Sequence, residues 1–349
     1  MAPSDKAALE QLEATVTSAQ ALCQQLATAL DDVYKNPSTP ASAVDSKIIP
    51  LTLARDAATL LLSGPVLGVA SAVQACDPAL YTAFFRKELA WRSRRILVTL
   101  SELLGKIPKD GKILSGAQKT GFAAESRGSL PATGILWSAC DEVTALVSKG
   151  ISGYFAKRVD EWRDTLKDVM EELKEWGDEE PDDDEDDDDD DDTAHDADND
   201  NNETIDSAQD ILDDLMGSGQ AIPRDDPKGI RPRLESTLRR VRLVVLLYQA
   251  ISKRRLKKLP ALPPPADSSY TNMPQRLDEA ARVLEALPDS FGDLASAFYE
   301  MEPSVIDQAA DDCFFAAFAA GELLSAPWDG GQDEFSEWTE KFKTEIKKS

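Results

Sequence analysis

Histidine is almost absent from this chain of 349 residues, which contains a single one, His195. That residue lies in a run of aspartates, where nothing holds an imidazole in a fixed geometry for nucleophilic or acid–base catalysis. Walker loops, Rossmann glycine fingerprints and paired cysteine motifs are also missing from the sequence. We therefore expect a protein that is not an enzyme and that uses no cofactor.

Cysteine is scarce, and the four cysteines show no metal-type spacing. Each lies among apolar residues, as buried reduced thiols do: Cys23, Cys76, Cys140 and Cys313. The N-terminus lacks the apolar core of a signal peptide, and no uncharged apolar run reaches membrane-spanning length. These absences argue against a secreted disulfide scaffold, so we expect a cytoplasmic and nuclear protein with no membrane partner.

Two clusters of carboxylates can be compared with metal sites, the run Asp182–Asp192 and the pair Asp311-Asp312. A Mg²⁺ ion needs a few oxygens held in near-octahedral positions by rigid supports. The run offers many oxygens without such support, and the pair fits better as the exposed edge of a core helix. We expect neither cluster to bind a metal.

Acidic charge is concentrated in one tract. The formal net charge is −26, and 18 acidic residues lie within 178–203, which has no Lys or Arg. Outside it 46 acids face 38 bases, so the rest is only mildly acidic and no direct nucleic-acid binding is expected. Because such dense like charge cannot be buried, we predict a disordered acidic linker over 178–204. It would join an N-terminal helical bundle, 1–177, to a C-terminal helical bundle, 205–349.

Apolar residues in the first segment recur at alternating steps of three and four, which is the seam of a helix packed in a bundle. The seam consists of Leu9, Leu12, Val16, Ala19, Cys23, Leu26, Leu30 and Val33, and Asn36-Pro37 should end the helix. Asp77-Pro78 predicts the N-terminus of a helix that runs to about Leu104. Other helices are predicted over about 45–75 (with a kink or break at Gly64-Pro65), 131–148, 151–177, 205–216, 232–256, 273–287, 290–301, 303–325 and 332–347. No window shows the period of two that is typical of strands, so the chain should be all-α.

Basic residues gather in 224–258, where twelve Lys or Arg face three acids. Five of them have the pattern of a short nuclear-import signal: Lys253, Arg254, Arg255, Lys257 and Lys258. The alternative is the basic, solvated end of a helix, where cations also favour the helix dipole. A third interpretation is a surface that attracts the acidic tract.

The residues after this cluster match the spacing of a polyproline ligand for SH3 domains, a cation followed by two apolar–proline dipeptides. They are Lys257, Leu259, Pro260, Leu262 and Pro263. Because such matches arise often by chance and consecutive prolines commonly form a stiff spacer, both interpretations stay open. Thr39 and Thr193 match minimal kinase patterns, which are more often unmodified than regulatory.

The segment Thr133-Gly-Ile-Leu-Trp-Ser-Ala-Cys-Asp-Glu-Val143 precedes a charged helix ending Met170-Glu-Glu-Leu-Lys-Glu-Trp176, and the acidic tract follows. This order resembles the cyclin-D-binding protein (GCIP) family, as a distant member such as a fungal one, most closely over 133–176. The resemblance suggests two antiparallel helical bundles like those of vinculin and α-catenin. The motif residues are Thr133, Gly134, Trp137, Cys140 and Asp141; we expect Trp137 and Cys140 to pack in the core.

The resemblance also implies a non-enzymatic regulator of cell-cycle progression and transcription. Such a protein would act by binding protein partners, a cyclin or a transcription factor. The alternative is an acidic-tract chaperone that shields basic partners such as histones. Deleting residues 181–202 should abolish histone binding in that case and leave a cyclin contact intact.

Overall fold

A computed structural model describes residues 3–40, 62–107, 130–179, 221–263 and 272–348. Regular structure in these ranges is entirely helical, without a strand, so the predicted all-α class is confirmed for the described part of the chain. No helix in the same ranges is both long and apolar enough to cross a membrane. The predicted linker over 178–204, apart from its first two residues, and the predicted helix over 205–216 lie outside the described residues.

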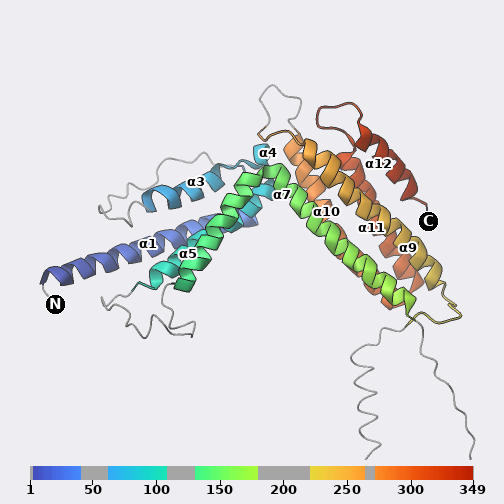
Figure 1. Cartoon of the computed structure of the whole chain (residues 1–349), viewed down its shortest axis with the longest axis horizontal. Helices are drawn as coiled ribbons and strands as arrows, with labels where there is room; N and C mark the ends of the chain where they lie inside the picture. The colour runs from blue at the N-terminus through green and yellow to red at the C-terminus, as the bar shows by residue number, and fades with distance from the viewer. Residues whose placement is uncertain (1–2, 41–61, 108–129, 180–220, 264–271, 349) are drawn as a thin grey trace, which may run out of the picture. The chain divides into compact units, whose positions relative to one another are not determined.

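Nine α-helices carry the fold of the described ranges (Figure 1). They are α1 (Pro3–Lys35), α3 (Leu67–Ala75), α4 (Pro78–Tyr81), α5 (Ala83–Gly105), α7 (Leu130–Asp178), α9 (Ile230–Ala250), α10 (Met273–Tyr299), α11 (Pro303–Ser325) and α12 (Glu334–Glu345). Short π-helical turns cover Leu62–Val66 and Ile251–Arg255, and a 3₁₀ turn covers Leu256–Lys258. The predicted ends of α1 and α11 agree with the structure within one residue.

The chain divides into two compact units. The first contains Met1–Lys157, Leu256–Ala281 and Trp328–Gly330, and the second contains Arg158–Arg255, Arg282–Pro327 and Gly331–Ser349. Part of the segment 151–177 thus belongs to the second unit. The predicted division into 1–177, 178–204 and 205–349 stays a prediction, because its linker lies almost wholly outside the described residues.

In the first unit α1 and α5 run antiparallel, side by side (Figure 1). The Gln20 amide donates to the carbonyl of Ser101 at 3.1 Å, and farther along α1 the Asp31 carboxylate lies 3.5 Å from Arg94. The core between the helices of this unit comprises Cys23, Ala27, Leu30, Val66, Ala70, Val73, Ala90, Leu97 and Leu100. In the predicted seam of α1, Val16, Ala19, Cys23 and Leu30 are buried, so the prediction is confirmed there, whereas it was wrong for Leu12, which is 46% exposed.

The helix predicted from Asp77 to Leu104 is interrupted in the structure. The Asp77 carboxylate caps α4 as expected, but Thr82 has a φ of 78° and separates α4 from α5. Two backbone N–H groups at the start of α5, those of Ala83 and Phe84, donate to the carboxylate of Asp278 at 2.7 and 2.9 Å. A prediction of one continuous helix was wrong because this cap comes from a residue far along the chain.

Gly150 divides α7 into two parts, with φ 65° and ψ −178°. Glycine tolerates this conformation, so the predicted separation of helices 131–148 and 151–177 is confirmed. In the second part of α7, apolar residues recur at alternating steps of three and four; Val169 among them is half-buried and the others are buried: Phe155, Val159, Trp162, Leu166, Leu173 and Trp176.

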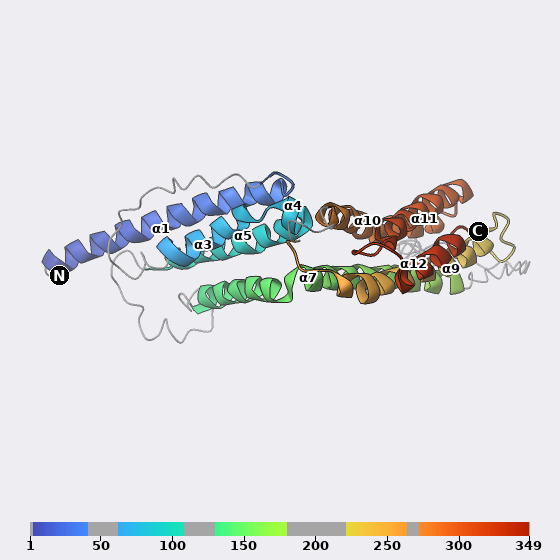
Figure 2. The ribbon, with the colours of Figure 1, turned by 90° about the horizontal axis from the view of Figure 1, so that it is seen from above.

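In the second unit, α7 and α9 run antiparallel. Arg231 at the start of α9 donates to the carbonyl of Gly177 at 3.2 Å, whereas Ser252 after the end of α9 lies 3.3 Å from Asp160. Figure 2 shows α9, α10, α11 and α12 lying together. Large buried side chains fill this unit: Trp162, Leu166, Trp176, Leu247, Tyr248, Phe291, Phe298, Phe314, Phe335 and Phe342.

Pro288 lies inside α10, although the sequence predicts a break between 287 and 290. A proline has no N–H, so the carbonyl four residues earlier, that of Leu284, loses its intrahelical donor. The buried Tyr248 hydroxyl donates to this carbonyl at 2.7 Å. The prediction of two helices was wrong because a tyrosine from α9 satisfies the group that the proline leaves free.

Candidate protein-interaction surface on helix α7

The first part of α7, residues 130–149, is fixed on α5 by charged contacts. Arg95 Nη1 lies 2.7 Å from each carboxylate oxygen of Glu142, and Arg92 Nη1 donates to the Glu142 carbonyl at 3.1 Å. Ala139 and Leu146, three residues before and four after Glu142, are buried. These residues define the inner face of this part of α7.

The opposite face carries a second seam with alternating steps of three and four, which we call the outer seam. It consists of Leu130, Thr133, Trp137, Cys140, Thr144 and Val147. Such spacing places side chains on one face of a helix. Leu130 is 72% exposed, Trp137 69% and Val147 60%. A row of exposed large apolar side chains on one face is typical of a surface that meets a partner.

Trp137 and Cys140 were predicted to pack in the core, and this prediction was wrong, since both are exposed. The helix has two seams of similar spacing, and spacing alone does not say which of them turns inward. In the structure, Glu142 pairs with arginines of α5 on the side that turns inward, where Ala139 and Leu146 are also buried. Of the other motif residues, Thr133 is half-buried and both Gly134 and Asp141 are exposed.

Cys140 behaves as an apolar member of the outer seam. Partial desolvation raises the pKa of its thiol above the ordinary value, and the negative charge of Asp141 raises it further. The thiol is therefore neutral at physiological pH, and a neutral cysteine packs like a small hydrophobic residue. Its carbonyl accepts a hydrogen bond from Thr144 Oγ1 at 2.9 Å, within the helix.

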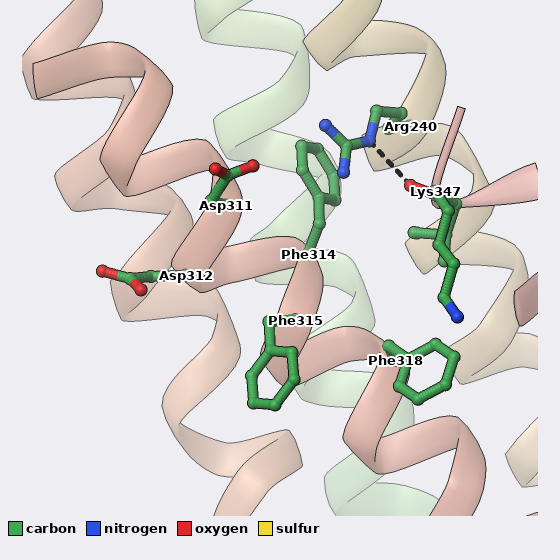
Figure 3. A pocket seen from close by; sticks show the side chains of 8 residues that line it. Arg240, Asp311, Asp312, Phe314, Phe315, Phe318 and Lys347 are labelled. Atoms are coloured by element: carbon green, nitrogen blue, oxygen red, sulfur yellow. Dashed lines mark hydrogen bonds between the residues drawn. The ribbon is translucent and has the colours of Figure 1, made fainter. Parts of the chain in front are cut away.

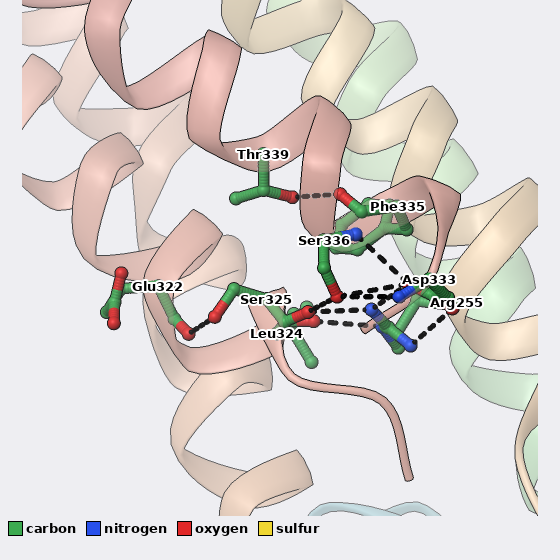
Figure 4. Close-up of polar contacts among 8 residues, drawn as sticks. All are labelled: Arg255, Glu322, Leu324, Ser325, Asp333, Phe335, Ser336 and Thr339. Atoms are coloured by element: carbon green, nitrogen blue, oxygen red, sulfur yellow. Dashed lines mark hydrogen bonds and ion pairs between the residues drawn. The ribbon is translucent and has the colours of Figure 1, made fainter. Parts of the chain in front are cut away.

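The basic cluster at the end of α9 does not form one exposed set. Arg255 is fully buried, and its guanidinium donates to the carbonyls of Leu324 and Ser325 at 2.8 Å (Figure 4). It also pairs with Asp333 at 3.1 Å and lies over the ring of Phe335. Arg255 thus ties the end of α9 to the end of α11 and to the start of α12.

Asp333 is the N-cap of α12 and the anionic partner in this network. Burial favours its neutral form, but the Ser336 N–H and the Arg255 guanidinium outweigh burial, so the pKa of Asp333 lies below its ordinary value. Asp333 and Ser336 also form a capping box. The carboxylate of Asp333 therefore caps the start of α12 and also balances the buried positive charge of Arg255.

The remaining predicted import residues, Lys253, Arg254, Lys257 and Lys258, are exposed within short helical turns. Their role in nuclear import stays a prediction, now for a set without Arg255. In the predicted SH3 ligand, Lys257 and Pro263 are exposed, whereas Leu259, Pro260 and Leu262 are half-buried. That role also stays a prediction.

Among the described residues, no group of three or more His, Cys, Asp or Glu side chains is arranged so that it could hold a metal ion. Asp311 and Asp312 lie exposed on α11, as the sequence predicts for the edge of a core helix. The run Asp182–Asp192 lies outside the described residues.

The helix that carries the outer seam lies in a part of the chain that is similar to a known protein family. Residues 62–179 match the family model described as "Grap2 and cyclin-D-interacting, N-terminal". A protein of Schizosaccharomyces pombe described as uncharacterized is 23% identical over 282 residues, covering 78% of this chain and 70% of that protein. No solved structure matches the chain. The resemblance expected from residues 133–176 is confirmed, because residues 62–179 match the N-terminal model of the Grap2 and cyclin-D-interacting family.

Proposed function

We propose that this chain is a helical interaction protein that binds a D-type cyclin through the outer seam of α7. The proposal rests on one observation, the exposed Trp137 at the centre of the outer seam, which lies within the residues that match the family. The description of that family supplies the class of partner. Binding would regulate cell-cycle progression and transcription in the cytoplasm and nucleus.

The outer seam is suited to a partner helix. Alternating steps of three and four are the pattern that lets one helix pack its side chains between those of another. Tryptophan is strongly enriched among the residues that dominate binding energy at protein interfaces. Trp137 stands between Thr133 and Cys140, whose small side chains leave room beside the indole for side chains of a partner.

The same proposal includes the arrangement of the helices in antiparallel bundles. Within the first unit α1 and α5 are antiparallel, and within the second α7 and α9 are antiparallel. These pairs support antiparallel bundles of the kind found in vinculin and α-catenin, with the acidic linker as the connection between α7 and α9 within the second. In this arrangement α7 would present its outer seam from the first bundle.

Substituting Trp137 by alanine in the full chain tests the cyclin contact. Truncating an interface tryptophan of this type costs about 2 kcal/mol or more, which corresponds to a roughly 30-fold rise in Kd. Because Trp137 is mostly exposed, the free energy of unfolding should change by about 0.5 kcal/mol or less. Isothermal titration calorimetry with purified D-type cyclins would measure the Kd.

Phe315→Ala is the matched control, since Phe315 is 73% exposed on α11 and lies outside the residues that match the family. It should leave cyclin affinity unchanged. The proposal fails if the unaltered chain binds no D-type cyclin, or if Trp137→Ala binds as tightly as the unaltered chain.

A further inference from the structure

A groove of about 510 Å³ opens in the second unit between α9, α11 and the residues that follow α12 (Figure 3). It is lined by Arg240, Asp311, Asp312, Phe314, Phe315, Phe318, Ile346 and Lys347. All of these residues lie outside the range that matches the family model. The groove is therefore separate from the outer seam of α7 and from the family resemblance.

Three phenylalanines of α11 give the groove an aromatic surface (Figure 3). Phe314 is buried and contacts Phe291 inside the unit, so it forms the floor. Phe318 is half-buried, whereas Phe315 is 73% exposed. A phenylalanine this exposed beside a hollow offers an anchor for an apolar side chain of a partner.

Cations border the groove on α9 and after α12. The Arg240 guanidinium lies 3.7 Å from the centre of the Phe314 ring, and its Nε donates to the Ile346 carbonyl at 2.9 Å. Within the described residues, its two Nη nitrogens make no hydrogen bond, so a carboxylate could bind both. Lys347 Nζ lies 4.5 Å from the centre of the Phe318 ring and makes no ion pair with a described residue.

Acidic side chains border the groove on α11. Burial of the guanidinium lowers the pKa of Arg240 below its ordinary value. The negative charge of Asp311 partly opposes this shift, because it favours the charged form of Arg240. Asp311 and Asp312 are exposed and form no ion pair with described residues. The groove thus combines an aromatic surface with cations on one side and carboxylates on the other.

We propose that this groove binds an amphipathic partner helix with an apolar anchor, an acidic side chain and a basic side chain. The anchor packs on Phe315 and Phe318, the carboxylate binds Arg240 and Lys347, and the cation faces Asp311. Grooves between helices commonly accept an amphipathic helix in this way, and charges of both signs fix its direction. A purely acidic segment such as 182–192 supplies carboxylates but no apolar anchor.

A display library of 16-residue helical peptides, varied at apolar, acidic and basic positions, is selected against the full chain. Fluorescence anisotropy then gives the Kd of a selected peptide for each variant of the chain. Phe315→Ala should raise the Kd about tenfold or more. Lys347→Glu should weaken the same peptide, and exchanging the peptide's acidic residue for lysine should restore affinity for that variant.

Two substitutions serve as controls: Leu246→Ala, at an exposed leucine of α9 outside the groove, and Trp137→Ala, in the outer seam. Neither should change the Kd of the peptide. The proposal is overturned if no peptide is selected, if the selected peptides lack an acidic residue, or if Phe315→Ala binds them normally.

The chain itself offers one competing occupant, because residues 205–216 read Ile-Asp-Ser-Ala-Gln-Asp-Ile-Leu-Asp-Asp-Leu-Met and combine acidic with apolar side chains. Deleting these residues should leave the Kd of the peptide unchanged. A gain in affinity of tenfold or more on deletion would mean that the chain fills its own groove, and an external partner would be refuted.

Discussion

Replacing Arg255 by methionine should increase the local opening of α12 more than the same substitution at any other basic residue of 224–258. Methionine retains much of the apolar volume but none of the donors. In the unaltered chain Arg255 has 1% of its side chain exposed and Asp333 has 19%. Methionine would therefore leave the Asp333 carboxylate partly buried without its cation, and the Leu324 carbonyl without this donor.

The expected loss follows from these contacts. Removing one partner of a buried ion pair costs about 3–5 kcal/mol. Asp333 retains some contact with water, and the Ser325 carbonyl still accepts a hydrogen bond from Ser336 Oγ at 2.6 Å. We therefore expect a loss at the lower end of this energy range. A loss of about 3 kcal/mol corresponds to a roughly 100-fold increase in the open population of α12.

Hydrogen exchange of the α12 amides, read by mass spectrometry, measures that population. Arg255→Met should raise their exchange rates about 100-fold. Arg254→Met, at the exposed neighbour, should leave them nearly unchanged. Adding Asp333→Asn to Arg255→Met should recover part of the loss, because it removes the stranded charge. Equal exchange rates in Arg255→Met and the unaltered chain would refute this account of the network.

Two further predictions concern contacts that the sequence does not reveal. Tyr248→Phe should lower the free energy of unfolding by about 1–3 kcal/mol, measured in urea, because the Leu284 carbonyl stays buried without a donor; an unchanged value would contradict this role. Burial raises the pKa of Asp278 above 3.8, although two backbone N–H groups oppose the shift. The folded chain then holds the proton more tightly, so the free energy of unfolding should fall as pH rises from 3.8 through the folded pKa. Asp278→Asn, which keeps a capping oxygen, should lack this fall in a urea series from pH 4 to 7, and identical pH profiles would count against the assignment.

Local signals in the sequence predicted much of the fold. Asn36-Pro37 marks the end of α1, Pro303 the start of α11 and Gly150 the division of α7, and all three agree with the structure. The errors arose where a distant residue decides a local conformation. Asp278 caps α5 after Thr82, and the Tyr248 hydroxyl satisfies the carbonyl that Pro288 leaves free within α10.

The basic cluster shows the same limit of local sequence signals in the prediction of a functional site. The sequence presents five cations of equal appearance, yet Arg255 differs from its neighbours because the ends of α11 and α12 surround it. Its partners lie about 70 residues or more along the chain. Composition therefore identifies a basic segment but not which of its members belong to the interior.

The first part of α7 shows how polar and apolar contacts together accompany the exposure of one face of a helix. Its inner side carries the buried Ala139 and Leu146 and the partly buried Leu136, whereas the outer face holds Trp137, a larger side chain. Covering an indole is worth on the order of 2–4 kcal/mol. On the inner side of the helix, however, Glu142 is held by Arg92 and Arg95, beside the buried Ala139 and Leu146. Rotating the helix to hide the indole would require Glu142 to leave both arginines and would expose Leu146. Under the proposed function, the free energy of burying Trp137 is gained when a partner binds.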